Sequence, residues 1–347
     1  MTSGTPRVLF VIPGFARRST FVETDRALLA RHFAVTTLVR EPEDRLFSAR
    51  IARHLRRHDL ALAWFADTHA QAAVRWGRRL GKPVVVIPGQ YEFFAAPEGP
   101  YGLALESPRR YRQACEVVSE CDLVLAVSKY HAGLVRQAQQ RPVPVRVLYH
   151  GFDDTIYGGG TVKEPLVVTV THLGSRARIW HKGLETFARA AAALPGVRFA
   201  LAGGYDETLA AGLQELAQGR LEFTGALPPE EVAGLLARAA VYCQLSATET
   251  FGCALAEAML CECVPVVTDR GALPEVAGDV GFYAPYGDAE QTVAQIEQAL
   301  ASDRGPAARR RIQEEFPLAQ RERGLVEAVC SVLSGARRAA AGGSEAP

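Results

Sequence analysis

The stretch ETFGCALAEAMLCECVPVVT, residues 249–268, joins a helix-forming segment directly to a buried strand. Ala, Leu, Glu and Met fill positions 254–260, and the apolar run Val-Pro-Val-Val follows at 264–267. A short apolar run behind an amphipathic segment is typical of a parallel sheet covered by helices. Because Glu is rarely buried without a partner, Glu249 and Glu257 in this apolar stretch predict a ligand or an ion pair.

The same alternation runs along most of the chain and predicts two sets of six strands. The predicted strands are Arg7–Ile12, Ala34–Val39, Ala61–Phe65, Pro83–Ile87, Leu123–Val127 and Val143–Leu148, then Leu166–Thr171, Val197–Ala202, Leu221–Phe223, Ala240–Cys243, Val264–Val267 and Gly281–Tyr283. Helical patterns separate most of them, as at Phe21–His32, Gly183–Ala193, Pro229–Ala239 and Phe251–Leu260. We therefore expect an α/β protein with two doubly wound, Rossmann-like domains that face each other across a cleft.

The Gly-rich segment GFDDTIYGGGTVKEP breaks the alternation after residue 150 and suits a hinge. This predicts an N-terminal domain at 1–150, a hinge linker at 151–163 and a C-terminal domain at 164–334. The last amphipathic stretch, Leu318–Leu333, predicts a helix that can pack back on the N-terminal domain. The tail at 335–347 lacks apolar residues to bury and is expected to be disordered.

Composition places the chain among soluble, cytoplasmic proteins. It has 347 residues, more than one hydrophobic core usually serves, with 48% hydrophobic and 22% charged residues. No apolar run reaches the length of a membrane span, and the N-terminus does not read as a secretory signal. Seven cysteines without framework spacing indicate free thiols. Cys261 and Cys263 look like half a zinc site, but no second pair completes it, which favours small hydrophobic residues.

Charge is divided unevenly between the two halves. Residues 1–150 carry 22 basic and 13 acidic residues, a net charge of +9, whereas residues 151–347 carry a net charge of −8. The N-terminal half is therefore expected to prefer anionic partners. Its arginine clusters, Arg53, Arg56 and Arg57 with Arg75, Arg78 and Arg79, suit peripheral contact with an anionic membrane, or equally a solvated Arg-rich face.

Residues 246–260 themselves indicate a binding site. Ser246–Glu249 follows a strand and Phe251–Leu260 opens a predicted helix, whose first amides suit an anionic or hydroxyl-rich ligand. A helix over 249–257 would separate the two glutamates by about 12 Å, roughly the span from a sugar to a ribose across a diphosphate. Carboxylates accept hydrogen bonds from sugar hydroxyls, so the pattern suggests a nucleotide sugar. Alternatively, Glu249 is a first-turn helix residue and Glu257 pairs with a nearby Arg or Lys.

The segment ETFGCALAEAM, with PVVTDRGALPEVAGDVGFY behind it, resembles the E-x7-E region of glycosyltransferase family 4. That family comprises retaining enzymes of the GT-B fold. THLGSRARIWHKGLETFARAAAALPGVRFALAGG and LEFTGALPPEEVAGLLARAAVY resemble the preceding segments of its nucleotide-binding domain. CDLVLAVSKYHAGLV and VLYHGFDDTIY match the end of the acceptor domain and the hinge. The resemblance covers most of the chain and is most specific within 165–285.

The resemblance implies roles for individual residues. Arg176 and Lys182 would grip the diphosphate, Glu249 would hold hydroxyls of the donor sugar, and Glu257 would hold the ribose. Arg178 competes with Arg176 for its role. The donor-binding set so implied is Gly14, Arg176, Lys182, Gly225, Leu227, Glu249, Phe251, Gly252, Leu255 and Glu257. A departing nucleoside diphosphate needs its charge neutralised, so a basic pair also makes independent chemical sense.

The chain departs from the family pattern at three places. Thr250 stands where the family usually has Gly, and His150 where it commonly has Asn. Many members place a His after the fourth strand, where this chain reads IPGQYEFF. Glu92 in that segment is the candidate catalytic group of the N-terminal domain, able to accept a proton or bind an acceptor hydroxyl. His69, after the third strand, is the other candidate.

The sequence thus predicts a retaining hexosyltransferase that uses a UDP- or GDP-sugar as substrate, with no cofactor and no metal. The catalytic set would be Glu249, Arg176, Lys182 and Glu92. No Asp-x-Asp pair is present to hold a metal, and no G-x-G-x-x-G supports a nicotinamide enzyme. The acceptor would be a carbohydrate or a lipid-linked saccharide at the inner face of the membrane, and no nucleic acid is implied. The alternatives are an inactive glycosyltransferase-like partner subunit and a sugar-nucleotide epimerase.

Overall fold

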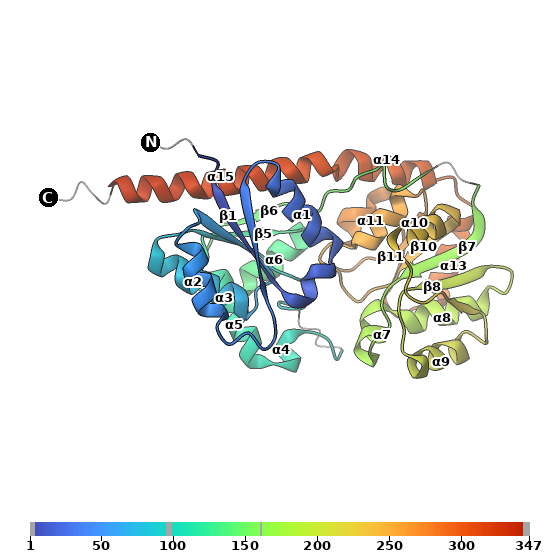
Figure 1. Cartoon of the computed structure of the whole chain (residues 1–347). Coiled ribbons are helices and arrows are strands. Elements are labelled where there is room, and N and C mark those ends of the chain that lie inside the picture. The colour runs from blue at the N-terminus through green and yellow to red at the C-terminus, as the bar shows by residue number, and fades with distance from the viewer. Residues whose placement is uncertain (1–3, 95–98, 160–161, 343–347) are drawn as a thin grey trace. The chain divides into compact units, whose positions relative to one another are not determined.

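The computed structural model describes residues 4–94, 99–159 and 162–342, and the chain divides into two compact units. The first unit comprises Met1–Ala95, Gly102–His150 and Ala319–Pro347, and the second comprises Ala96–Tyr101 and Gly151–Leu318 (Figure 1). The division at His150 falls at the start of the predicted hinge. Residues from Ala319 onward return to the first unit.

The first unit is a parallel six-stranded sheet in the order β2-β1-β3-β4-β5-β6. Its elements are β1 (Arg7–Pro13), η1 (Gly14–Arg18), α1 (Thr20–Ala30), β2 (Ala34–Arg40), α2 (Phe47–Leu55), β3 (Leu60–Trp64), α3 (Thr68–Leu80), β4 (Val84–Ile87), α4 (Leu103–Glu106), α5 (Pro108–Glu120), β5 (Leu123–Ala126), α6 (Lys129–Ala138), β6 (Val145–Val147) and most of α15 (Leu318–Gly342). Every residue of β3, β4 and β5 is buried, as expected for parallel strands covered on both faces.

The second unit repeats this plan with a parallel sheet in the order β12-β11-β10-β7-β8-β9. Its elements are β7 (Glu164–Val170), α7 (Arg176–Lys182), α8 (Leu184–Ala193), β8 (Arg198–Ala202), α9 (Glu207–Leu216), β9 (Leu221–Phe223), α10 (Pro229–Arg238), β10 (Ala239–Gln244), α11 (Cys253–Leu260), β11 (Val264–Thr268), α12 (Leu273–Ala277), η2 (Gly278–Val280), β12 (Phe282–Ala284), α13 (Ala289–Leu300) and α14 (Gly305–Glu315). Cys261 and Cys263 are buried in its core. All twelve predicted strands are present, within one or two residues at their ends.

Strand order places a switch point in each sheet. In the first, β1 lies between β2 and β3, and in the second, β7 lies between β8 and β10. At such a point the loops after two adjacent strands leave the sheet in opposite directions and open a crevice. In the second unit these are the loops after β7 and β10, and the second of them carries Glu249.

Two predicted helix boundaries are wrong. The helix expected over Phe251–Leu260 begins only at Cys253, because Gly252 adopts φ +100° and acts as its N-cap. Glu249 therefore lies in the preceding loop, and the helical spacing assumed between the two glutamates does not apply. The last helix runs to Gly342 instead of ending at 333, since the Ala- and Arg-rich sequence favours helix, and residues 343–347 of the expected tail lie outside the described part.

A buried ion pair ties α15 to the rest of the first unit. Arg321 and Asp25 are 2% and 1% exposed, with Nη2 of Arg321 2.6 Å from Oδ2 of Asp25. Arg321 also donates to the backbone oxygens of Leu148 and Tyr149, and Asp25 accepts from the Trp64 indole at 3.0 Å. Both charges are thus fully engaged inside the core, where an unpaired charge would be very costly.

None of the helices in the described part of the chain is long and apolar enough to cross a bilayer.

We expect Arg321→Met to destabilise the protein by about 3–5 kcal/mol, because it leaves the Asp25 carboxylate buried without its partner. Urea unfolding at neutral pH measures this. The control is Arg323→Met, which removes an exposed arginine from the same helix turn. Adding Asp25→Asn to Arg321→Met should recover part of the loss, and a double variant as unstable as the sum of the singles would contradict the pairing.

Candidate active site

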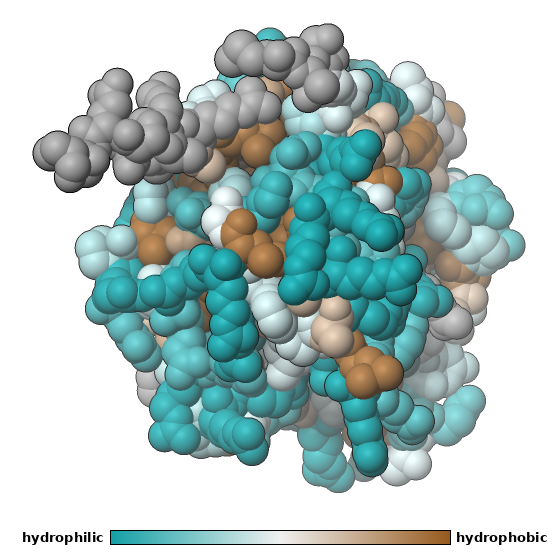
Figure 2. Space-filling view, turned by 60° about the vertical axis from the view of Figure 1, so that its left-hand side comes forward, coloured by the Kyte–Doolittle hydropathy of each residue, from teal (hydrophilic) through white to brown (hydrophobic). Residues whose placement is uncertain are grey.

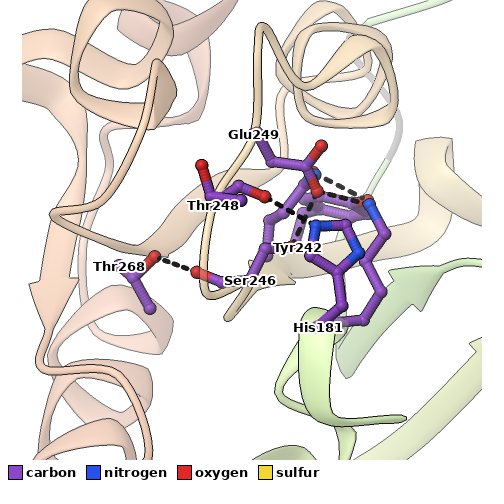
Figure 3. Close-up of polar contacts among 8 residues, drawn as sticks. His181, Tyr242, Ser246, Thr248, Glu249 and Thr268 are labelled. Atoms are coloured by element: carbon purple, nitrogen blue, oxygen red, sulfur yellow. Dashed lines mark hydrogen bonds and ion pairs between the residues drawn. The ribbon is translucent and has the colours of Figure 1, made fainter. Parts of the chain in front are cut away.

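The loop after β10, residues 245–252, carries Glu249 at the switch point of the second sheet. Its carboxylate is buried, and one oxygen, Oε1, accepts three hydrogen bonds (Figure 3). These come from Nζ of Lys182, from Nε2 of Gln244 at 2.8 Å and from Oγ of Ser246 at 2.8 Å. The Tyr242 hydroxyl donates to Oε1 of Gln244, which leaves the amide nitrogen directed at the carboxylate. Glu249 is therefore held in one position.

Close backbone packing shapes this loop. Gly271 adopts φ +65°, and a Cβ there would lie 2.5 Å from the Glu249 backbone oxygen, so only glycine fits. The amide of Ala272 donates to that same oxygen at 2.8 Å, and the Thr268 hydroxyl donates to the Ser246 oxygen at 2.7 Å (Figure 3). The turn after β11 therefore supports the loop after β10.

Helix α7 closes the other side of the loop. The His181 ring donates to the Thr248 oxygen at 2.9 Å, and its backbone oxygen accepts from Ala247 at 2.8 Å. Gly183 ends the helix with φ +62°, where a Cβ would clash with the Leu245 oxygen at 2.1 Å. These contacts bring Lys182, far from Glu249 in the sequence, to the carboxylate.

The electrostatics favour an ionised pair. Burial raises the pKa of Glu249, but the charges of Lys182 and His181 and the hydrogen bonds from Lys182 and Ser246 outweigh it and hold that pKa at about 2. Burial lowers the pKa of Lys182, with Glu249 opposing and Arg178 adding to the effect. Burial lowers the pKa of His181 to about 4, so this imidazole is neutral at pH 7.

The structure distinguishes the two candidate arginines. Arg176 is the exposed first residue of α7, whereas Arg178, two residues further along the helix, is half-buried. Burial is the main cause that lowers the pKa of Lys182 and His181, and the charge of Arg178 adds to it in both. Within the described residues the Arg178 Nε has no hydrogen-bond partner. Arg178, which the sequence analysis names as the competitor of Arg176, is thus an arginine whose charge acts on Lys182.

The start of α11 offers backbone groups to a ligand. Gly252 caps this helix without a side-chain cap. Phe251 is buried against Phe152 and Phe316, and Leu255 is fully buried. The side chains of Phe251 and Leu255 therefore belong to the core, and only their backbone could contact a donor.

Glu257 lies in the middle of α11, and its side chain is half-buried. Burial raises its pKa to about 7, and hydrogen bonding from the Tyr157 hydroxyl partly opposes that rise. Its partner is thus a tyrosine of the linker, in place of the Arg or Lys considered from the sequence. Gly225 and Leu227 lie in a turn after β9, where Gly225 has φ +75° and accepts from the Gly203 amide.

The remaining predicted residues lie in the first unit. Gly14 follows β1, packed beside the Glu41 side chain. Glu92 is buried in the loop after β4, where its Oε1 accepts from the Ala66 amide at 3.0 Å. His69 is fully buried on α3, and its ring donates to the Trp64 oxygen at 2.6 Å. Burial lowers the pKa of His69 to about 4, which suits a structural role.

Glu92, like His69 with its Nδ1, has one buried polar atom that no hydrogen bond reaches within the described residues. In Glu92 this atom is Oε2. Burial raises the pKa of Glu92 to about 7. His131 on α6, which sequence reasoning missed, is also buried with Nε2 unpartnered among the described residues, and its Nδ1 accepts from the Val127 amide at 3.3 Å. The backbone of Gly89 acts on the pKa of both His131 and Glu92. An acid in the loop after β4 and an imidazole on α6 thus lie near one backbone segment.

Sequence reasoning also missed Gln244, Ser246, His181 and Tyr157. Gln244 and Ser246 could have been found, since polar residues at the carboxyl end of a buried parallel strand are typical of sites. His181 and Tyr157 carry no such signal.

The raised pKa of Glu92 predicts a pH-dependent stability. The folded pKa of about 7 exceeds the ordinary value of 4.5, so this carboxyl destabilises the fold as pH rises from 4.5 through 7. Glu92→Gln should therefore be more stable than wild type at pH 8, by up to about 3 kcal/mol, and little different at pH 5. Urea unfolding at both pH values measures this, with the exposed Glu43→Gln as control. Equal gains at both pH values would contradict it.

Comparison with known proteins finds a family profile and a curated relative that each match part of the chain. The family profile of glycosyl transferases group 1 matches residues 165–302. The Escherichia coli O-antigen chain mannosyltransferase B is 35% identical over 86 residues, which cover 25% of this chain and 23% of that protein.

Solved structures match over nearly the whole chain. Anabaena HepE (Alr3699) in complex with UDP and glucose has a TM-score of 0.77 at 19% identity, over 94% of this chain and 100% of that one. The sucrose-phosphate synthase of Thermosynechococcus elongatus has a TM-score of 0.76 at 17% identity, over 95% and 100%. Residues 165–302 therefore match the group 1 glycosyl transferases, and the chain as a whole has the two-domain α/β GT-B fold.

Proposed function

We propose that this chain is a glycosyltransferase that moves a hexose from a UDP- or GDP-sugar to a hydroxyl acceptor. The observation that carries the proposal is the buried Lys182–Glu249 pair at the switch point of the domain that matches the group 1 profile. The complexes of HepE with UDP and glucose, on the same fold, support a UDP-sugar.

In this proposal the cations receive the diphosphate. Lys182 and Arg178, with Arg176 at the exposed start of α7, would neutralise the charge that grows on the leaving group. The first amides of α11 would add partial positive charge. Lys182 is already paired in the free protein, so a diphosphate would share it with Glu249 and be placed next to that carboxylate.

Glu249 would hold the transferred sugar. Its three donors all bond Oε1, and Figure 3 shows the other carboxylate oxygen directed away from them. Since its pKa of about 2 keeps Glu249 ionised at any physiological pH, that second oxygen would accept hydrogen bonds from sugar hydroxyls. Glu257 on α11 would accept those of the ribose.

We further propose that transfer retains the anomeric configuration and proceeds without a divalent metal. Retention is supported by the family 4 resemblance of the E-x7-E segment. Metal independence is supported by the protein's own positive groups around the pair, since they can supply the charge neutralisation that Mg²⁺ otherwise gives. The buried acid Glu92 is the proposed acceptor-side group, because its pKa near 7 suits proton transfer.

The acceptor is proposed to be a cell-envelope glycan or a lipid-linked saccharide. The name of the E. coli relative, an O-antigen chain mannosyltransferase, supports a polysaccharide acceptor. An inactive partner subunit would bind a nucleotide sugar without turnover, and an epimerase would change the donor without an acceptor. The activity assay below distinguishes these outcomes.

We expect Glu249→Gln to lower kcat at least 100-fold while UDP affinity changes little, because Glu249 would bind the sugar and not the phosphates. Lys182→Ala should weaken UDP binding about tenfold or more, since it removes a charged donor to the diphosphate. The measurements are turnover of UDP- and GDP-hexoses in excess EDTA, NMR of the product anomer, and calorimetric titration with UDP. The control is Glu185→Gln, an exposed acid on α8.

Each part of the proposal has its own contrary result. An inverted product contradicts retention, and loss of activity in EDTA that Mg²⁺ restores contradicts metal independence. Unchanged turnover by Glu249→Gln contradicts the role of the buried pair. Wild-type UDP affinity in Arg178→Ala together with a loss in Arg176→Ala would return the diphosphate role to Arg176.

A basic face of the first unit supports peripheral contact with anionic lipid. Helix α3 packs between α2 and α5, and these helices and the turn after α2 carry exposed arginines. These are Arg53, Arg56, Arg57, Arg75, Arg78, Arg79, Arg109, Arg110 and Arg112. Figure 2, which brings this side of the first unit forward, shows mostly hydrophilic residues with hydrophobic ones in small separate patches. Binding would therefore be electrostatic, at about 1 kcal/mol for each arginine near the bilayer.

We expect the protein to sediment with phosphatidylglycerol vesicles at low salt and to be released by 0.5 M NaCl. Replacing Arg53, Arg56 and Arg57 together by Gln should weaken binding at least tenfold, because three favourable charges are lost. The matched control replaces three exposed arginines of the second unit, Arg189, Arg220 and Arg310, by Gln. Equal losses in both triple variants would mean a general charge effect and contradict a specific face.

A further inference from the structure

The linker segment Phe152–Gly159 is fixed to the second unit at several points. At one end, the Phe152 amide and oxygen form hydrogen bonds with the chain around Pro317. In the middle, Gln313 donates to the Asp154 carboxylate at 2.7 Å. The segment is thus an ordered part of this unit, packed along α11 and α14.

One guanidinium joins this segment to the end of α11. Arg309, on α14, donates to the backbone oxygen of Tyr157 at 2.7 Å and to that of Asp154 at 3.1 Å. It also donates to the backbone oxygen of Leu260, the last residue of α11. Arg309 therefore fixes the position of the Tyr157 backbone beside the C-terminal end of α11.

From that position the Tyr157 side chain reaches back along the helix to Glu257. Its hydroxyl acts as a hydrogen-bond donor to the carboxylate and lowers the Glu257 pKa against the rise caused by burial. Burial and the facing carboxylate together raise the pKa of Tyr157 itself, so it stays a donor throughout the physiological range. Tyr157, a linker residue, thus donates the hydrogen bond that favours the ionised form of the desolvated Glu257 carboxyl.

Other ionisable groups surround the pair. Cys253 and Cys261 flank Glu257 on its own helix, and both act on the pKa of Tyr157. Lys163 and Arg309 approach from the linker and α14, where they act on Cys261, and Tyr242 faces Glu257 from β10. Of these groups, Tyr157 is the one whose hydrogen bond acts on the Glu257 pKa.

We propose that Tyr157 is a positioning residue for nucleotide binding, which orients the Glu257 carboxylate and keeps it ionised for the two ribose hydroxyls. The inference rests on the proposed function, in which Glu257 is the ribose ligand. A carboxylate offers about four acceptor positions, so the tyrosine occupies one and leaves room for both hydroxyls. A protonated Glu257 would lose part of this capacity and affinity would fall.

The chemistry predicts that nucleotide affinity depends on pH through Glu257. With a pKa of about 7, a part of the wild-type molecules carries a protonated Glu257 at neutral pH. Tyr157→Phe removes a donor that favours ionisation, so the carboxyl should titrate at a higher pH. The effect of the substitution should therefore be largest near pH 7 and should shrink near pH 9, where Glu257 is ionised in both proteins.

The experiment is calorimetric titration of the full chain with UDP and with GDP at pH 6, 7, 8 and 9. Variants are compared with wild type at each pH, so titration of the nucleotide phosphate cancels. Tyr157→Phe is expected to raise Kd about three- to tenfold at pH 7, the effect of one hydrogen bond to a charged group, and less than twofold at pH 9. Tyr283→Phe, which removes a hydroxyl that donates to the Gly278 oxygen in the same unit, is the control and should leave Kd unchanged.

Glu257→Gln separates this inference from the function on which it rests. It should weaken binding at pH 9, and Tyr157→Phe added to it should bring no further pH-dependent change. Wild-type affinity in Glu257→Gln, or no binding of either nucleotide by the wild-type chain, would contradict the proposed function itself. A weakened Glu257→Gln beside an unchanged Tyr157→Phe would overturn only the role of Tyr157. So would a Tyr157→Phe that is equally weak at every pH, because that pattern is structural.

Discussion

A carboxylate buried at the carboxyl edge of the second sheet must be neutralised, and much of that unit is arranged to do so. Glu249 is desolvated, and its ionised form persists because Lys182, Gln244 and Ser246 all bond one of its oxygens. Removing any of these donors would take a hydrogen bond from the buried Oε1 of Glu249, which costs free energy. The Glu249 loop packs against α7 and against the turn after β11. The connections that follow β7, β10 and β11 therefore have to pack together.

Glycine makes that arrangement possible. Gly271 and Gly183 each adopt a positive φ and each lies where a Cβ would overlap a backbone oxygen of the Glu249 loop. The close approach brings carbonyl and amide groups of neighbouring turns into hydrogen-bonding range, so backbone hydrogen bonds support the loop beside those from the His181 and Thr268 side chains. A site for a charged ligand gains from this, since little has to be ordered when the ligand binds.

The three acids of the candidate site differ in the pKa of their carboxyl groups. Glu249 has a cationic partner and a pKa of about 2, whereas Glu92 and Glu257 have no such partner among the described residues and have pKa values of about 7. Desolvation raises the pKa of all three, so the partner decides the charge state. An acid held ionised suits binding of hydroxyls, and an acid poised near neutrality suits proton transfer or sensitivity to pH. Asp25 is likewise neutralised, by Arg321, but that buried pair lies in the core of the first unit and stabilises the fold.

Local pattern was enough to determine the twelve strands, both parallel sheets and the break after residue 150, because side-chain periodicity and apolar runs are properties of neighbouring residues. The sequence also indicated the segment 246–257 as a candidate site. Tertiary structure alone decided which groups meet there. Lys182 reaches Glu249 across 67 positions, Tyr157 reaches Glu257 from the linker, and the charge of Arg178 acts on Lys182. Such pairings depend on how strands order and loops pack, and no periodicity in the chain encodes them.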